Sequence, residues 1–205
     1  MPIRTAHRRA VLAGLAGVLA RPGATCAQAA PVRVALETAQ GRIVIELALD
    51  KAPVTAANFL RYVDQKRYDG ASFYRASKAP GAPQAGMVQG GLNSDPAKKL
   101  KPIAHESTAK TGLTHKDGAV SLARRAQGTA TSEFFICLGD QSYLDADPAA
   151  PGDNAGFAVF GQVVEGMETV RAILALPTSR TGGGPGMEGE MLARPVQIVQ
   201  ARRTP

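Results

Sequence analysis

The chain has 205 residues, the size of one domain, and 44% of them are apolar while 20% are charged. These proportions exclude a disordered or collagen-like chain, and the 22 glycines and 14 prolines indicate many turns, as in an all-β fold. The formal charge of +7 would suit nucleic-acid binding only if the basic residues were clustered in the folded domain.

The first 29 residues have the three-part layout of a secretory signal peptide. Arg4, Arg8 and Arg9 form a basic start, an uncharged apolar run follows at 10–20, and small residues at 27–29 supply a cleavage site. The run is too short for a bilayer span of about 20 residues, so we expect no stable membrane anchor. We predict a cleaved signal peptide at 1–29 and one domain at 30–205 of an exported, periplasmic protein. Arg8-Arg9 suits the twin-arginine route, and the Sec route stays open.

Removal of this segment changes the charge and the cysteine count. The segment holds four arginines and no acidic residue, so the mature chain has 20 basic against 17 acidic residues. No dense basic run is left, and we predict no nucleic-acid partner. Cleavage would also remove Cys26. Cys137 would then have no intramolecular partner, and its apolar neighbours predict a buried, unreactive thiol.

Alternating and short apolar runs bounded by turn residues predict eight strands in the mature chain. They are expected at 32–38, 42–47, 72–75, 87–89, 118–123, 133–138, 157–163 and 196–199. Apolar residues at helical spacing predict helices at 56–65 and 168–174. Pro- and Gly-rich segments predict loops at 78–85, 145–156 and 178–190. We therefore predict a mainly β fold, a closed eight-stranded antiparallel barrel capped by two α-helices.

Four segments resemble the cyclophilin family in their order and approximate spacing. They are FYR at 73–75, MVQGG at 87–91, GAVSLA at 118–123 with FFIC at 134–137, and FAVFG at 157–161 with VEGM at 164–167. Each is weak alone, but together they extend the resemblance over 32–199, almost the whole mature chain. On this resemblance the chain is identified as a member of the cyclophilin-type peptidyl-prolyl cis/trans isomerases, most similar to the exported bacterial branch.

The resemblance implies a cyclophilin-like barrel with a shallow outer groove, in which an X-Pro peptide lies while its prolyl bond rotates. Rotation breaks no bond, so we expect no nucleophile, metal or cofactor. In the family an arginine lies against the substrate proline, and the matching residue is Arg75. The matching groove glutamine is Gln89, which in the family orients the arginine and bonds the substrate backbone. Arg75 and Gln89 are therefore the predicted catalytic residues.

The resemblance also implies an apolar pocket for the proline ring. The matching positions are Met87, Phe135, Leu144 and Phe157. Ala123 and Arg124 match the strand edge that presents main-chain groups to the peptide. Phe134 and Phe135 are consecutive, so a strand must direct them to opposite sides, one into the core and one to the groove.

Two departures from the family pattern concern this pocket. Gly86 stands where an aromatic residue usually precedes the methionine, and the insertion at 145–156 lies next to the groove. Asp145, Asp147 and Asp153 in that insertion fit no calcium-loop spacing, so we interpret them as part of a solvated loop. The three histidines match no catalytic position of the family.

The leading hypothesis is an isomerase, expected to be a monomer, that assists the folding of exported proteins and has Pro-containing polypeptides as partners. The alternative is a cyclophilin-like module that binds Pro-containing segments with little catalysis. Gly86 makes it plausible, as does the loop between Arg75 and Met87, which is several residues longer than in the familiar cyclophilins. A third hypothesis, an unrelated barrel for a small hydrophobic ligand, would require the motif matches to be coincidental.

Overall fold

The structure is a computed structural model that describes residue 1 and residues 30–204, except 94, 96, 181 and 185. Residues Pro31–Pro205 form one compact unit. The predicted signal peptide therefore lies almost entirely outside the described residues. Within those residues, no helix is long and apolar enough to cross a membrane.

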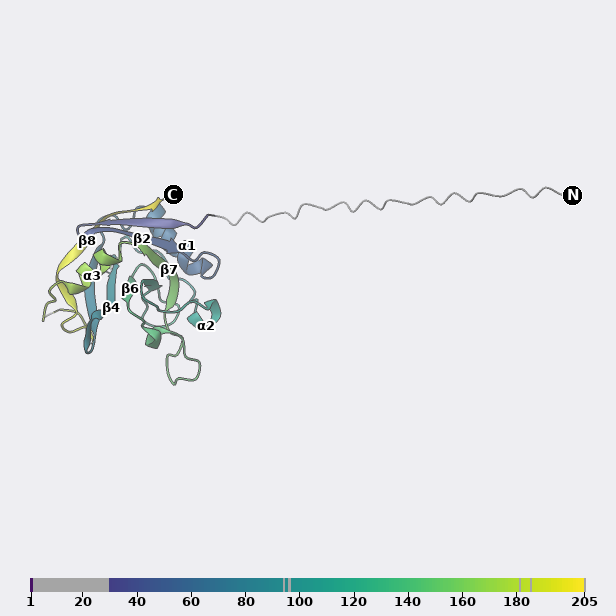
Figure 1. The fold of residues 1–205 in the computed structure, drawn as a ribbon. Coiled ribbons are helices and arrows are strands. Elements are labelled where there is room, and N and C mark those ends of the chain that lie inside the picture. The colour runs from purple at the N-terminus through teal and green to yellow at the C-terminus, as the bar shows by residue number, and fades with distance from the viewer. Residues whose placement is uncertain (2–29, 94, 96, 181, 185, 205) are drawn as a thin grey trace. The chain divides into compact units, whose positions relative to one another are not determined.

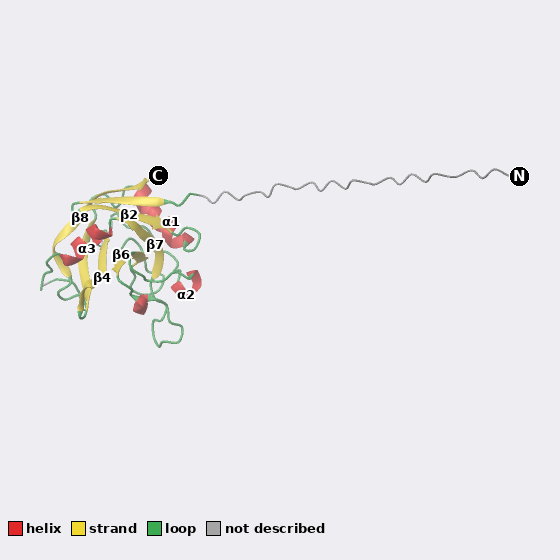
Figure 2. Ribbon diagram, in the orientation of Figure 1, coloured by secondary structure: helices red, strands yellow, loops and turns green. Residues whose placement is uncertain are grey.

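The strands close into a barrel whose neighbouring pairs are all antiparallel (Figures 1 and 2). Around the barrel the order is β1-β2-β7-β5-β6-β4-β3-β8. The strands are β1 (Arg33–Thr38), β2 (Gly41–Leu47), β3 (Ser72–Ala79), β4 (Ala82–Gly91), β5 (Ala119–Leu122), β6 (Phe134–Leu138), β7 (Ala158–Glu165) and β8 (Met191–Thr204). The predicted mainly β class and closed eight-stranded barrel are confirmed.

The core consists of alternate side chains of the strands and of side chains from two helices. Helix α1 (Pro53–Asp64) contributes Phe59 and Val63, and helix α3 (Met167–Ala175) contributes Val170 and Ile173, all of them buried. Six aromatic side chains are fully buried in this core: Phe59, Tyr62, Tyr68, Phe73, Phe134 and Phe160. Burial of apolar area in this core, aromatic and aliphatic together, drives folding, and the described part of the chain has no disulfide to add to it.

Helix α1 begins at Pro53, three residues before the predicted start, because proline suits the first helical turn. Its cap residue, Ala52, has no side-chain oxygen for the free N–H groups. Glu106 replaces that local cap and accepts from the main-chain N–H groups of Val54 and Thr55 at 3.1 and 2.7 Å. A carboxylate at this end also interacts favourably with the helix dipole.

The predicted loop at 78–85 is wrong. Strands β3 and β4 continue through it as a hairpin in which Ala79 is opposite Ala82. Pro80 and Gly81 form the two-residue turn, and Gly81 has the positive φ of +75° that such turns require. The Pro/Gly pair therefore ends one strand and starts the next.

The backbone of the same hairpin leaves room only for glycine at position 86. The φ of Gly86 is +137°, and a Cβ atom there would lie 2.0 Å from the Ser77 carbonyl oxygen. An aromatic residue at this position would force β3 and β4 apart just before Met87. The absence of an aromatic side chain at Gly86 therefore follows from the close approach of the two strands.

Two further predictions need correction. The described residues include a third α-helix, α2 (Thr108–Thr111), which lies in a connecting segment and buries only Thr108. Its single turn is capped by the Ser107 hydroxyl at the start and by Gly112 in the left-handed region at the end.

Strand β8 is longer than the predicted strand at 196–199. It begins at Met191 and ends at Thr204, because it pairs with β3 near its start and with β1 near its end.

Candidate active site

A β-bulge in β3 presents Arg75 on the outer face of the barrel. Phe73 is opposite Gly90 and Arg75 is opposite Gln89, so Tyr74 is an extra residue on β3. Phe73 and Ala76 on either side of the bulge lie in the barrel core. The bulge thus turns the polar groups of Tyr74 and Arg75 away from the core.

Arg75 and Gln89 are directly bonded. The Arg75 Nη1 donates to Gln89 Oε1 at 2.9 Å, and the Gln89 side chain is itself buried. Gln89 is in turn opposite Phe135 on β6. The two predicted catalytic residues therefore lie together, across neighbouring strands, beside the predicted pocket.

A second apolar cluster lies on the outer face of the barrel next to this pair. Its buried members are Ala119, Phe135, Cys137, Leu144 and Val159, and Met87, Leu113, Ala123 and Phe157 pack against them. Phe134 belongs to the barrel core and Phe135 to this cluster, which confirms that they face opposite sides. The structure thus gathers all five predicted apolar site residues, including Ala123, in one cluster.

Cys137 is free and buried in this cluster. Burial, with smaller contributions from Asp145 and Asp117, raises the pKa of the thiol to about 12. The predicted burial of Cys137 is confirmed, and the thiol stays protonated at neutral pH, when it is a poor nucleophile.

The side chain of Arg124 forms a wall of the site. The family resemblance implies only main-chain groups from Arg124, at a strand edge. The side chain is only 4% exposed and pairs with Asp153. Arg124 Nε donates to the Gly156 carbonyl oxygen at 2.8 Å, and the guanidinium carbon lies 5.3 Å from the Phe157 ring centre. Asp153 is therefore an ion-pair partner rather than a freely solvated residue, and it ties the insertion 145–156 to the end of β5.

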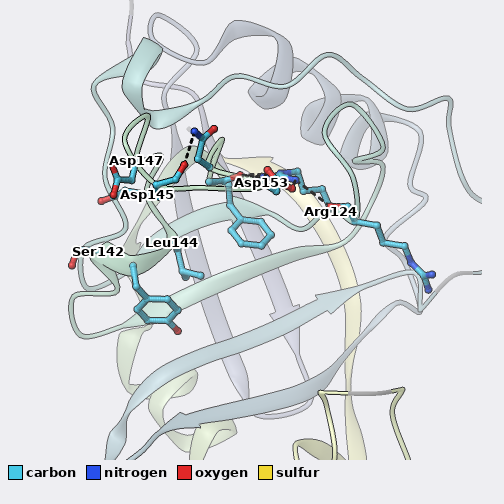
Figure 3. Close-up of a pocket in the computed structure, with 12 residues that line it drawn as sticks. Arg124, Ser142, Leu144, Asp145, Asp147 and Asp153 are labelled. Carbon is cyan, nitrogen blue, oxygen red and sulfur yellow. Dashed lines mark hydrogen bonds and ion pairs between the residues drawn. The ribbon is translucent and has the colours of Figure 1, made fainter.

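A pocket of about 400 Å³ opens beside Arg124 and is lined in part by the insertion (Figure 3). In Figure 3, Asp145 and Asp147 lie on one side of it and Arg124 with Asp153 on the other. Leu144 and Phe157, two of the predicted proline-ring residues, also line it. The insertion consequently extends the apolar cluster into a wider groove with polar walls.

Comparisons with known proteins show which family the chain belongs to. A sequence model described as "Cyclophilin type peptidyl-prolyl cis-trans isomerase/CLD" matches residues 33–203. A "Peptidyl-prolyl cis-trans isomerase" of Acinetobacter baylyi is 34% identical, and the match covers 82% of this chain and 84% of the relative. "Peptidyl-prolyl cis-trans isomerase A" of Dickeya dadantii is 40% identical, with 73% and 74% covered. This chain belongs to the cyclophilin family. It is a peptidyl-prolyl cis/trans isomerase.

A solved structure supports the fold independently of close sequence similarity. The crystal structure of a Cryptosporidium parvum cyclophilin, obtained in the presence of the dipeptide Ala-Pro, has a TM-score of 0.66 at 19% identity. The match covers 84% of this chain and 99% of that chain. The cyclophilin barrel is therefore shared over the whole length of the solved protein.

His115 lies behind the outer apolar cluster, and sequence reasoning missed it. Its buried ring is stacked on Phe135, with centres 5.8 Å apart and planes at 11°. Nδ1 lies 2.6 Å from an oxygen of Asp145, and Nε2 lies 2.9 Å from the Ser121 hydroxyl. The interpretation of Asp145 as solvated is therefore wrong. His115 forms the support behind Phe135, and no local pattern connects it with Asp145, which is 30 residues away.

The environment of His115 predicts a pH-dependent stability. Burial lowers the pKa of His115 below its usual 6.5, and the Asp145 carboxylate opposes that shift only partly. The unfolded chain therefore binds a proton at His115 below about pH 6.5 while the folded chain resists it, so stability falls as the pH decreases. For one proton the slope can reach about 1.4 kcal/mol per pH unit. Urea unfolding at pH 7.5, 6.5 and 5.5 measures it.

The matched control is His115→Gln, which retains hydrogen-bonding groups but cannot take up the proton. Its unfolding free energy should change less over pH 7.5–5.5 than that of the wild type, while other titrating groups contribute equally to both. Ion pairs with arginines lower the pKa values of Asp64 and Asp69 from their usual 3.8. The stability that these pairs contribute is therefore lost only below about pH 3.8, outside the pH range of this comparison. Identical pH slopes for the two proteins would contradict the role given to His115.

Proposed function

We propose that Arg75 is the catalytic residue of this isomerase, that Gln89 orients it, and that the outer apolar cluster binds the substrate proline. The observation that carries this assignment is the Arg75–Gln89 bond, which holds a guanidinium beside the apolar residues Met87 and Phe135. A charged group that donates several fixed hydrogen bonds next to an apolar ring pocket suits a twisted prolyl amide.

The chemistry follows from the peptide bond. Resonance between the nitrogen lone pair and the carbonyl sets a rotation barrier of about 18–20 kcal/mol. At the twisted transition state the nitrogen loses conjugation and becomes a hydrogen-bond acceptor, which it is not in the planar amide. An Arg75 N–H donated to that nitrogen is therefore stronger in the transition state than in the ground state, and only such an interaction raises the rate.

The apolar cluster has a separate task in this mechanism. Phe135 and Phe157 meet edge to face with ring centres 5.5 Å apart, and Leu144 packs beside them. We assign these side chains to the proline ring, which must stay in place while the preceding carbonyl turns. The pocket between Arg124 and the insertion 145–156 would receive the residues that flank the proline.

The deciding experiment is a protease-coupled or refolding assay on an X-Pro peptide, with wild-type protein and Arg75→Ala compared at equal folded concentration. Loss of most acceleration in the variant supports the assignment. Retention of full activity would exclude Arg75 as the catalyst and leave the isomerase activity itself unaffected.

We also propose that the enzyme acts on exported proteins in the periplasm. The support is the signal-peptide pattern at 1–29, with its basic start, apolar run and small-residue end. When the full chain is expressed in a bacterial host, N-terminal sequencing of the periplasmic fraction should begin at Ala30. An Arg8→Lys, Arg9→Lys double variant should lose export only if the twin-arginine route is used. Soluble cytoplasmic protein that keeps Met1 would refute export.

A further inference from the structure

The guanidinium of Arg75 is held on one edge by a carboxylate from the segment before β8. Arg75 Nε and Nη2 lie 2.8 and 2.6 Å from the same oxygen, Oε2, of Glu190. The Ser77 hydroxyl donates to the other oxygen, Oε1, at 2.6 Å. The two side chains are largely covered, with 14% of Arg75 and 27% of Glu190 exposed. An ion pair so placed is screened less than one at the surface.

The other edge of the guanidinium is held through Gln89. Gln89 Oε1 accepts from Arg75 Nη1, and Gln89 Nε2 donates to the Tyr74 hydroxyl at 2.9 Å. The Tyr74 hydroxyl donates in turn to Glu133 Oε2 at 2.6 Å. Burial, with the nearby Glu133 carboxylate, raises the pKa of Tyr74, so this hydroxyl keeps its proton. Because Tyr74 must donate to Glu133, the Gln89 amide can only present its carbonyl oxygen to Arg75.

Two of the five N–H bonds that an arginine side chain carries are donated in these contacts, one from Nε to Glu190 and one from Nη1 to Gln89, while Nη2 is in ionic contact with Glu190. Within the described residues, N–H bonds of Nη1 and Nη2 are left for a peptide. The main chain of Glu190 is fixed as well, since its carbonyl oxygen accepts from the Ala76 N–H at 2.8 Å, and the next residue, Met191, is opposite Arg75. The carboxylate is thus held in place by β3, independently of the ion pair.

We propose that Glu190 is a positioning residue of the isomerase, which fixes the plane of the Arg75 guanidinium so that its remaining N–H bonds meet the prolyl nitrogen. This inference rests on the proposed catalytic role of Arg75. The function of Glu190 is geometric: one of its oxygens accepts the Arg75 Nε–H and contacts Nη2, at a fixed distance from β3. Its negative charge is not the useful property, because a neighbouring anion weakens the positive potential that the guanidinium offers to the substrate.

Three substitutions separate geometry from charge. Glu190→Gln loses the charge but retains a carbonyl oxygen to accept the Arg75 Nε–H and contact Nη2, and its amide can donate to Ser77. Glu190→Asp retains the charge but is one methylene too short. Glu190→Ala loses both. We expect kcat/KM to fall about tenfold in the Asp and Ala variants, mainly through kcat, and to stay within about twofold of wild type in Glu190→Gln.

A spectroscopic measurement reports the position of Arg75 directly. The Arg75 Nε–H resonance in a ¹⁵N–¹H spectrum, identified by its absence in Arg75→Ala, should be sharp and slow to exchange in wild type and Glu190→Gln. In Glu190→Asp and Glu190→Ala it should broaden or exchange quickly, because the acceptor is lost. Thermal unfolding of each variant separates these effects from a loss of stability.

Asp69→Ala is the matched control, since Asp69 accepts two bonds from Arg202 at 2.7 and 2.8 Å in a comparable pair elsewhere on the barrel. It should leave kcat and the Arg75 resonance unchanged. Equal loss in Glu190→Gln and Glu190→Ala, or no loss in Glu190→Ala, would overturn the positioning role. If Arg75→Ala is inactive while Glu190→Ala is fully active, only the inference about Glu190 fails. If Arg75→Ala is fully active, the catalytic assignment fails first.

Discussion

Arg75→Ala is expected to lower kcat/KM on an X-Pro peptide by about 100-fold, with KM changed much less than kcat. The magnitude is that of removing one preorganised donor aimed at a developing acceptor in an enzyme site. The loss falls on kcat because the prolyl nitrogen accepts a hydrogen bond only when the amide is twisted. Protease-coupled kinetics over a range of peptide concentrations give the two constants separately.

Two variants make the Arg75 result specific. Arg75→Lys retains the positive charge but has no planar fork to bond Gln89 and Glu190 together, so it should lose most of the activity too. Arg202→Ala removes an arginine of similar pairing, bonded to Asp69 away from the site, and should retain normal kinetics. Arg75→Ala within threefold of wild type would exclude the proposed mechanism.

Phe134→Ala is expected to have the largest effect on stability, about 3–5 kcal/mol in the free energy of unfolding. Phe134 is fully buried, and its ring meets those of Phe59, Tyr68 and Phe73 edge to face at 5.4, 5.6 and 5.7 Å. Truncation leaves a cavity that the closed barrel cannot fill, because strands bonded on both sides have little freedom to move inward. Urea unfolding followed by circular dichroism measures the loss.

The contrasting variant is Phe157→Ala, on the outer face. Phe157 is only partly buried and packs against the second cluster, so its truncation should cost less stability but raise KM, because the ring pocket loses a wall. Phe134→Ala, assayed well below its unfolding transition, should keep the KM of the wild type. If Phe157→Ala destabilises the protein as much as Phe134→Ala, the separation into a structural core and a binding cluster is wrong.

The strands were predictable because their signal is local. Within the predicted strand 133–138, the continuous apolar run 134–138 predicts a strand buried on both faces, and Phe134 and Phe135 indeed belong to two different clusters. The segment at 78–85 was not predictable in the same way. Its prolines and glycines indicate a loop, but only pairing across the hairpin decides that all except Pro80 and Gly81 extend the strands.

The family motifs likewise predicted Arg75, Gln89, Met87, Phe135 and Phe157 as site residues, because those residues lie within short segments of recognisable order. Which groups surround them was decided by the tertiary structure. Glu190 is 115 residues from Arg75, and Asp145 is 30 residues from His115. Neither pair leaves a periodicity or spacing in the sequence, since each depends on how the closed barrel brings distant segments to one face. By itself the sequence determined the barrel strands and the guanidinium at the site; only the packing of β3, β4 and β8 decided what holds that guanidinium in place.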